Sequence, residues 1–256
     1  MKSFKDLFSE NTQDYAKFRP VYPEALFTYL ASTVQSHDLA FDVGTGSGQA
    51  AVVLAKHFKR VIATDPSQKQ LDAATKHPHV VYQQGPAEKL SAEAGSVDLL
   101  TAAQAFHWFK REEFFKEADR VLKPGGVLAL WTYSMTEISP DIDRTVHHLY
   151  EELLGKYWEP ERRLVEEGYR SVTLPFPELQ SPKIEMQAKW SLAHLVGYLG
   201  TWSALKTCIQ KTGQNPLEQV FPDLQQAWGQ SEFRSVKWPL SIRVCQRSID
   251  TKSHRL

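Results

Sequence analysis

The chain has 256 residues, of which 42% are hydrophobic, and its 30 Lys and Arg residues balance 30 Asp and Glu residues to a net charge of zero. This size and composition fit one large α/β domain, or one domain with an inserted subdomain, that buries a substantial core. Nucleic-acid-binding proteins usually carry a positive surplus, so we expect no nucleic-acid partner.

The apolar runs, the first residues and the cysteines indicate where in the cell the protein is expected. No apolar run reaches the roughly 18 residues of a membrane-spanning helix, and the first residues lack the apolar region of a signal peptide. Cys208 and Cys245 lie far apart and form no CxxC motif, which argues against disulfides and a cysteine zinc site. The histidines show no metal-ligand spacing. We therefore expect a cytoplasmic location, no membrane partner and no metal.

Residues 1–36 predict a polar head and a helix from Glu24 to about Ser36. From Leu39 to Tyr133, apolar strand-like runs alternate with helical patterns, and Ser67 is a candidate N-cap for the second of these helices. Because strands that alternate with helices form a parallel sheet covered on both faces, we expect an open, doubly wound α/β fold. The predicted strands are residues 39–43, 61–64, 80–82, 97–101 and 127–131, and the predicted helices are 49–58, 71–76 and 112–122.

Beyond Tyr133 the pattern becomes helix-rich, with several proline breaks. Residues 184–190 alternate like a strand and residues 191–210 are predicted to be helical. The tail 236–247 is predicted to be a strand, and Pro239 places part of it at an edge or a bulge. We expect three parts, residues 1–36, 37–135 and 136–256.

The most informative motif is Asp42-Val43-Gly44-Thr45-Gly46-Ser47-Gly48, between the first strand and the next helix. Glycines allow a tight turn and a close approach of the backbone to a ligand, and open α/β sheets bind ligands at this edge. A dinucleotide fingerprint would have its third glycine at Gln49, and a phosphate-binding P-loop would end in GK[ST]. The spacing disfavours both, and a NAD-dependent oxidoreductase stays as the alternative.

Asp65 ends the second strand, about twenty residues after the first glycine, where an acidic side chain reaches ribose hydroxyls in nucleotide-binding folds. Its two carboxylate oxygens match the two adjacent hydroxyl donors of a ribose. The alternative is an acid favoured only by the dipole of the following helix. We favour a nucleoside-containing ligand.

These residues resemble the class I S-adenosylmethionine-dependent methyltransferases. Residues 42–48 are similar to the family motif D/E-x-G-x-G-x-G, residues 85–90 to G-D-A-E-x-L-P and residues 123–128 to the L-K-P-G-G turn. Pro86 replaces the aspartate that accepts from the adenine amino group in many relatives, which leaves adenine to the Ala87 backbone and apolar packing. The resemblance implies cofactor contacts from Asp42, Gly44, Thr45, Gly46, Gly48, Asp65, Pro66, Ala87 and Glu88.

Residues 15–23, 103–109 and 200–204 are similar to the trans-aconitate methyltransferase and methyltransferase type 11 subgroup. In such proteins the N-terminal segment closes over the cofactor, which implies that Tyr15 and Arg19 approach the methionine carboxylate. Gln104 and Ala105 would line the cofactor. The resemblance implies an acceptor pocket after the fourth and fifth strands and in the C-terminal part, where we place His107, Trp108, Tyr133 and Trp202, although core packing is the default for such aromatic residues.

The resemblance implies a mostly parallel seven-stranded sheet, a lid helix within residues 1–36, a cofactor-binding core in 37–135 and a helical substrate-lid insertion in 136–256. We expect transfer of a methyl group from S-adenosyl-L-methionine to a carboxylate or hydroxyl of a small molecule, by a monomer or homodimer. A carboxylate needs no base, whereas a hydroxyl would need one, for which His107 is the candidate; packing alone is the other role for His107. A non-catalytic S-adenosylmethionine-binding protein is a further alternative.

Overall fold

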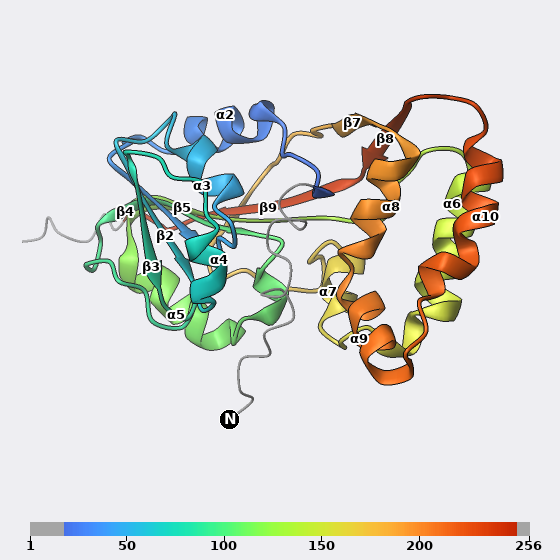
Figure 1. Ribbon diagram of the computed structural model, residues 1–256. Coiled ribbons are helices and arrows are strands. Elements are labelled where there is room, and N and C mark those ends of the chain that lie inside the picture. Colours follow the sequence, from blue (N-terminus) through green and yellow to red (C-terminus); the bar gives the residue numbers. More distant parts are fainter. Residues whose placement is uncertain (1–17, 250–256) are drawn as a thin grey trace, which may run out of the picture.

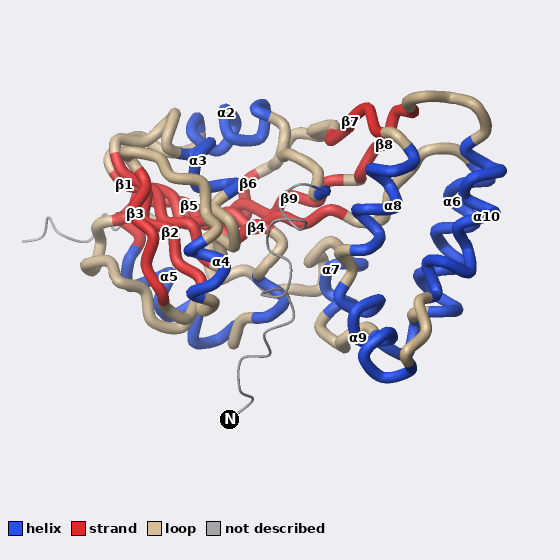
Figure 2. Tube along the Cα trace, in the orientation of Figure 1, coloured by secondary structure: helices blue, strands red, loops and turns tan. Residues whose placement is uncertain are grey.

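A computed structural model describes residues 18–249, so Tyr15 lies outside the described residues. A seven-stranded sheet in the order β3-β2-β1-β4-β5-β9-β6 runs through the molecule (Figures 1 and 2). β1 to β5 are parallel, while β9 is antiparallel to both β5 and β6. The prediction of a doubly wound, mostly parallel seven-stranded sheet is confirmed. The strands are β1 (Leu39–Val43), β2 (Arg60–Asp65), β3 (Val80–Gln84), β4 (Val97–Ala103), β5 (Leu122–Tyr133), β6 (Glu178–Leu179) and β9 (Leu240–Gln246).

The sheet has a core on each face. α2 (Glu24–Ser32) and α3 (Gln49–Leu54) cover one face and α5 (Arg111–Val121) covers the other (Figure 1). Neighbouring strand residues alternate between these cores: Leu99 packs with α2 and α3, while Leu100 packs with α5. Because successive side chains point to opposite faces and both faces are covered, the strands read as continuous apolar runs.

Apart from α4 (Gln68–Asp72) and the short η1 (Phe106–Trp108), the remaining helices form a helical lobe, residues 140–166 and 192–228, beyond the carboxyl end of β5 (Figure 1). A separate antiparallel pair, β7 (Met186–Trp190) and β8 (Arg234–Trp238), leads from this lobe back to the sheet. Within residues 18–249 no helix is both long and apolar enough to cross a membrane. The lobe contains α6 (Pro140–His147), η2 (His148–Leu153), η3 (Gly155–Tyr157), α7 (Arg162–Glu166), α8 (Leu192–Gly200), α9 (Ser203–Thr212) and α10 (Pro216–Trp228).

Several predicted boundaries were wrong. The first helix ends at Ser32, and the helix predicted over 49–58 ends at Leu54. The helix predicted to follow Ser67 and run through Leu71 to Lys76 is α4 (Gln68–Asp72), which ends earlier. Its predicted N-cap is confirmed, because Ser67 Oγ accepts from the Gln70 N–H at 3.4 Å. The helix predicted over 191–210 is two helices, because the chain turns at 201–202.

The tail strand was also predicted wrongly. Pro239 splits it into β8 and β9, which belong to different sheets, and β9 lies between β5 and β6 rather than at an edge. Proline has no N–H to donate to a ladder, so the strand breaks there. The tail therefore completes the main sheet and also joins it to the helical lobe.

Candidate functional site

The loop after β1 contains three glycines with positive φ, +68° at Gly44, +55° at Gly46 and +82° at Gly48. A Cβ on Gly44 would lie 2.6 Å from the Ala105 Cβ, and one on Gly48 would lie 2.1 Å from the Tyr82 hydroxyl. At Gly46 the nearest atom would be 3.9 Å away. Packing inside the protein thus requires two of the glycines, whereas Gly46 leaves space beside the backbone.

Hydrogen bonds fix this loop against the sheet. The N–H groups of Gly44 and Thr45 donate to the Thr64 carbonyl at 2.8 and 2.9 Å. The Asp42 carboxylate accepts from the hydroxyls of Thr45 and Thr101 at 2.6 and 2.7 Å. Burial raises the pKa of Asp42 to about 6. Asp42 therefore ties the loop to β4, and a direct contact from Asp42 to a ligand stays a prediction.

Asp65 lies beside the glycine loop, as the sequence predicts. Its Oδ2 accepts from the Gly46 N–H at 2.9 Å and its Oδ1 from the Ser67 N–H at 2.9 Å. A carboxylate has about four acceptor sites, so these two hydrogen bonds do not by themselves prevent Asp65 from accepting from a hydroxyl donor. The next residue, Pro66, accepts from Gln84 Nε2 through its carbonyl at 2.9 Å, which fixes the turn.

The turn after β3 lies at the same edge of the sheet. Ala87 is buried, and the Glu88 carboxylate accepts from the Lys110 N–H at 2.8 Å, at the N-terminus of α5. The N-terminus of a helix favours a negative charge. Glu88 therefore connects this turn to α5, and its contact with a cofactor stays a prediction.

Gln104, after β4, has φ of +51°, which is uncommon for a residue other than glycine. Its N–H donates to the Trp131 carbonyl at 2.9 Å, and its Oε1 accepts from the Tyr133 N–H at 3.3 Å and from the Thr132 hydroxyl. Such strained backbone persists only where the surroundings hold it. These bonds position the Gln104–Ala105 turn against Gly44.

His107 is buried, and its Nδ1 lies 3.2 Å from the hydroxyl of Tyr169. Burial, with a smaller contribution from the charge of Arg162, lowers the pKa of His107 to about 3. The imidazole is therefore neutral at pH 7 and a weak base, which disfavours it as the general base. The ring of Trp108, whose residue is 39% exposed, lies 4.9 Å from that of His107.

Arg19 joins the N-terminal segment to the end of β5. Its Nη1 donates to the Tyr133 hydroxyl at 3.1 Å, and its Cζ lies 5.4 Å from the centre of the Tyr198 ring. The Tyr198 ring lies 6.0 Å from that of Trp202, the N-cap residue of α9. Of the predicted pocket residues, Arg19 thus contacts Tyr133 directly and is connected to Trp202 through Tyr198.

Residues 41–130 match a family model described as a methyltransferase domain. A Dictyostelium discoideum protein named as a methyltransferase is 36% identical over 95% of this chain and 96% of its own length. A structure from Anaeromyxobacter dehalogenans, described as a type II methyltransferase, superposes with a TM-score of 0.84 at 44% identity, over 90% of this chain and 99% of that one. This chain belongs to the class I S-adenosylmethionine-dependent methyltransferases.

The methyltransferase uses S-adenosylmethionine, the cofactor named for a Saccharomyces cerevisiae relative that is 29% identical over 58% of this chain and 56% of its own length. The residues fit this cofactor. Gly46 leaves space beside the loop backbone, and the adjacent Asp65 has acceptor capacity for ribose hydroxyls. The oxidoreductase alternative is not favoured.

Sequence reasoning singled out none of Tyr150, Arg162 and Tyr169, although Tyr169 contacts His107 and Arg162 donates to Tyr150. Arg162 and Tyr150 come from the helical lobe, and Tyr169 follows α7 with φ of +60°. No motif or periodicity marks these residues, because their position depends on how the lobe packs against the sheet. Across residues 18–249, no group of three or more His, Cys, Asp or Glu side chains could hold a metal ion.

Proposed function

We propose that this methyltransferase acts on a carboxylate or a hydroxyl of a small molecule. A cavity of about 460 Å³ beyond the carboxyl end of β5 is the observation that carries the proposal. Its walls come from the chain after Tyr133, from η2 and from α7. Sites for small molecules are usually concave and of about 300–1,000 Å³.

In this proposal Asp65 holds the ribose, the main chain at Gly46 approaches the cofactor, and Arg19 binds the methionine carboxylate, which suits the planar fork of a guanidinium. Ala87 packs against adenine. His107, Trp108, Tyr133 and Trp202 surround the acceptor. The proposed cofactor contacts are Tyr15, Arg19, Asp42, Gly44, Thr45, Gly46, Gly48, Asp65, Pro66, Ala87, Glu88, Gln104 and Ala105.

The protein's contribution to the reaction is chiefly positional. The bound cofactor supplies a methyl group already activated by its sulfonium. Holding an acceptor in line with this group contributes up to roughly 7–11 kcal/mol. A carboxylate acceptor is ionised at neutral pH and needs no base, and the low pKa of His107 supports a carboxylate over a hydroxyl. In that case His107 donates or accepts a hydrogen bond only.

An acceptor screen tests this proposal. Purified protein with S-adenosylmethionine is offered small carboxylic acids and alcohols, and formation of S-adenosylhomocysteine is followed. We expect turnover of at least one class, while failure of all small acceptors beside methylation of protein or nucleic acid would contradict the proposal. An inactive His107→Ala variant that still binds S-adenosylhomocysteine normally would count against the mechanism without a base.

We also propose that the protein works in the cytoplasm as a monomer or homodimer, without a nucleic-acid partner, within the trans-aconitate methyltransferase-like subgroup. The zero net charge and the two free, buried cysteines support this setting. The similarity of residues 103–109 and 200–204 supports the subgroup. Gel filtration, and methylation of trans-aconitate compared with other acids, test these points.

A further inference from the structure

A hydroxyl and two aromatic rings hold the Arg162 guanidinium. Its Nε donates to the Tyr150 hydroxyl at 2.9 Å, and its Cζ lies 5.0 Å from the Trp158 ring centre and 5.6 Å from that of Tyr150. No carboxylate oxygen of residues 18–249 forms an ion pair with it. Aromatic faces fix the plane of a guanidinium, so binding an anion there costs less side-chain entropy than at an exposed arginine.

Arg162 lines the cavity beyond β5 together with Ser134 and Thr136. Thr136 is 2% exposed, and its hydroxyl has no hydrogen-bond partner within the described part of the chain. A buried hydroxyl without a partner is unfavourable. A cation and an unsatisfied hydroxyl on one cavity indicate a ligand with acceptor oxygens.

Two lining residues connect the cavity to residues proposed for the acceptor pocket. Ser134 directly follows Tyr133, and the ring of Tyr150 lies 5.5 Å from that of Trp202, which lies 6.0 Å from the ring of Tyr198. Tyr198 in turn contacts Arg19, whose Nη1 donates to Tyr133 at the end of β5. Arg162 thus lies near residues assigned to the acceptor pocket.

Three exposed carboxylates, Glu137, Glu151 and Glu166, also line this cavity. Glu166 accepts from the Tyr150 hydroxyl at 2.5 Å, and Glu151 lies 3.5 Å from His147. All three are exposed, while Arg162 is half-buried. Like charges repel, so these exposed carboxylates disfavour ligands that carry several phosphates.

We propose that Arg162 binds a carboxylate of the substrate, with the Thr136 hydroxyl as a second contact, and that the substrate is a small free carboxylic acid rather than its coenzyme A thioester. This inference rests on the proposed function. A guanidinium fork matches the two oxygens of a carboxylate, whereas the coenzyme A thioester of a monocarboxylic acid lacks that charge and would bring its phosphates near the exposed carboxylates.

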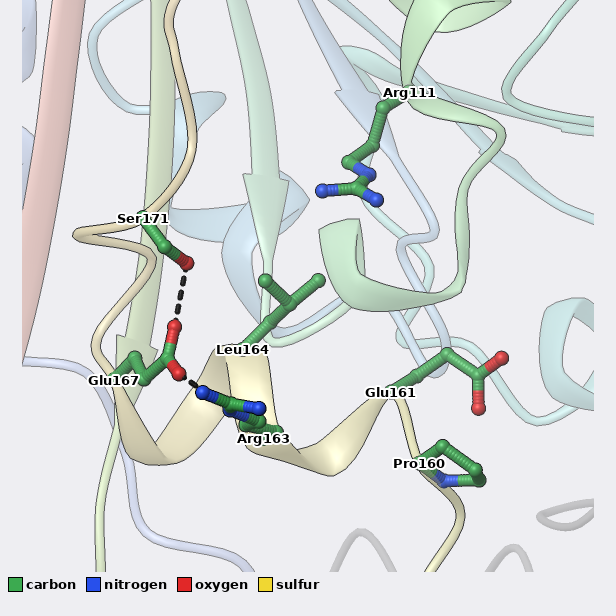
Figure 3. A pocket seen from close by; sticks show the side chains of 7 residues that line it. All are labelled: Arg111, Pro160, Glu161, Arg163, Leu164, Glu167 and Ser171. Atoms are coloured by element: carbon green, nitrogen blue, oxygen red, sulfur yellow. Dashed lines mark hydrogen bonds and ion pairs between the residues drawn. The ribbon is translucent and has the colours of Figure 1, made fainter.

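The test compares Arg162→Gln and Arg162→Lys with a matched control, Arg163→Gln. Arg163 lies on the same helix but faces a different, shallow pocket, where it pairs with Glu167 at 2.7 Å (Figure 3). The probes are short aliphatic and aromatic carboxylic acids, their primary amides and their coenzyme A thioesters. Formation of S-adenosylhomocysteine gives kcat and KM, and calorimetry gives the affinity for S-adenosylhomocysteine.

We expect methylation of free acids but not of the amides or thioesters. Loss of the charge-assisted bonds in Arg162→Gln should raise KM about 10- to 150-fold, with cofactor affinity unchanged. The KM of Arg162→Lys should lie between those of the wild type and Arg162→Gln, and the KM of Arg163→Gln should equal that of the wild type. Thr136→Val removes a hydroxyl with no described protein partner, so it should fold normally and also raise KM.

Equal use of thioesters or amides, or an unchanged KM in Arg162→Gln and Thr136→Val, would overturn the inference. A protein that binds S-adenosylhomocysteine but neither binds nor methylates any of the acids would overturn it as well. Absence of S-adenosylhomocysteine binding would instead contradict the proposed function, so the two failures are distinguishable. If Arg162→Gln does not fold, the KM values of Thr136→Val and Arg162→Lys test the inference in its place.

Discussion

Nδ1 of His107 lies 3.2 Å from the hydroxyl of Tyr169, and both side chains are buried. The contact joins the turn after β4 to the chain after α7, across 62 residues of sequence. It fixes the orientation of the imidazole, while burial keeps the ring neutral. His107 is thus a neutral group held in a fixed orientation.

The buried His107 should make stability depend on pH. Its folded pKa of about 3 lies below the unfolded value of about 6.5, so its contribution is complete above pH 6.5 and is lost as the pH falls toward 3. Between pH 8 and pH 5 the wild type should lose about 2 kcal/mol from this group, a loss that His107→Asn removes. Urea unfolding measures both proteins, with exposed His79→Asn as control. Equal pH slopes in wild type and His107→Asn would contradict the assignment.

The contact between Gly44 and Ala105 predicts a coupled pair. Gly44→Ala should lower the free energy of unfolding by roughly 2–5 kcal/mol. The alanine would have to adopt a left-handed conformation, and its Cβ would lie 2.6 Å from the Ala105 Cβ. Gly95→Ala is the control, since Gly95 has φ of +63° and open space, and should cost about 1–2 kcal/mol. Adding Ala105→Gly to Gly44→Ala removes the close Cβ contact, so in urea unfolding the double variant should regain the stability by which Gly44→Ala falls below Gly95→Ala. Equal costs at Gly44 and Gly95 would show that the loop simply moves away.

Asp98 should be important for folding. Its carboxylate is buried, accepts from the N–H groups of Asp38 and Leu39 at 3.0 and 2.8 Å, and pairs with Lys123 at 2.6 Å. Asp98→Ala leaves these donors without their acceptor and should destabilise by roughly 2–4 kcal/mol. Asp119→Ala, at an exposed pair with Arg247, should cost less than about 1 kcal/mol. A similar cost for both variants in urea unfolding would contradict this role.

The parts of the fold that depend on local patterns could be predicted from the sequence. The strand–loop–helix unit around residues 42–48 and the Ser67 cap each involve residues close in sequence, and the structure contains both. Parallel strands then bring Asp65 beside Gly46 without further information. Helix ends were less predictable. The helical apolar pattern continues past Leu54, whereas α3 ends at that residue.

The rest depends on contacts between distant segments. The sequence predicted Pro239 at an edge or a bulge of one strand, and only the pairing partners reveal that it divides two sheets. Arg162 stands in a polar, proline-interrupted stretch, and its contacts with Tyr150 and Trp158 form only in the folded lobe. The loop after β1 was therefore more predictable than the packing of the helical lobe.

The central claim is tested most directly by titrating the purified protein with S-adenosylhomocysteine in a calorimeter, beside Asp65→Ala, the exposed control Asp72→Ala and a titration with NAD. We expect a Kd of about micromolar, a loss of at least about tenfold in Asp65→Ala, little change in Asp72→Ala and no binding of NAD. Binding of NAD without S-adenosylhomocysteine, or an affinity that does not depend on Asp65, would contradict the account.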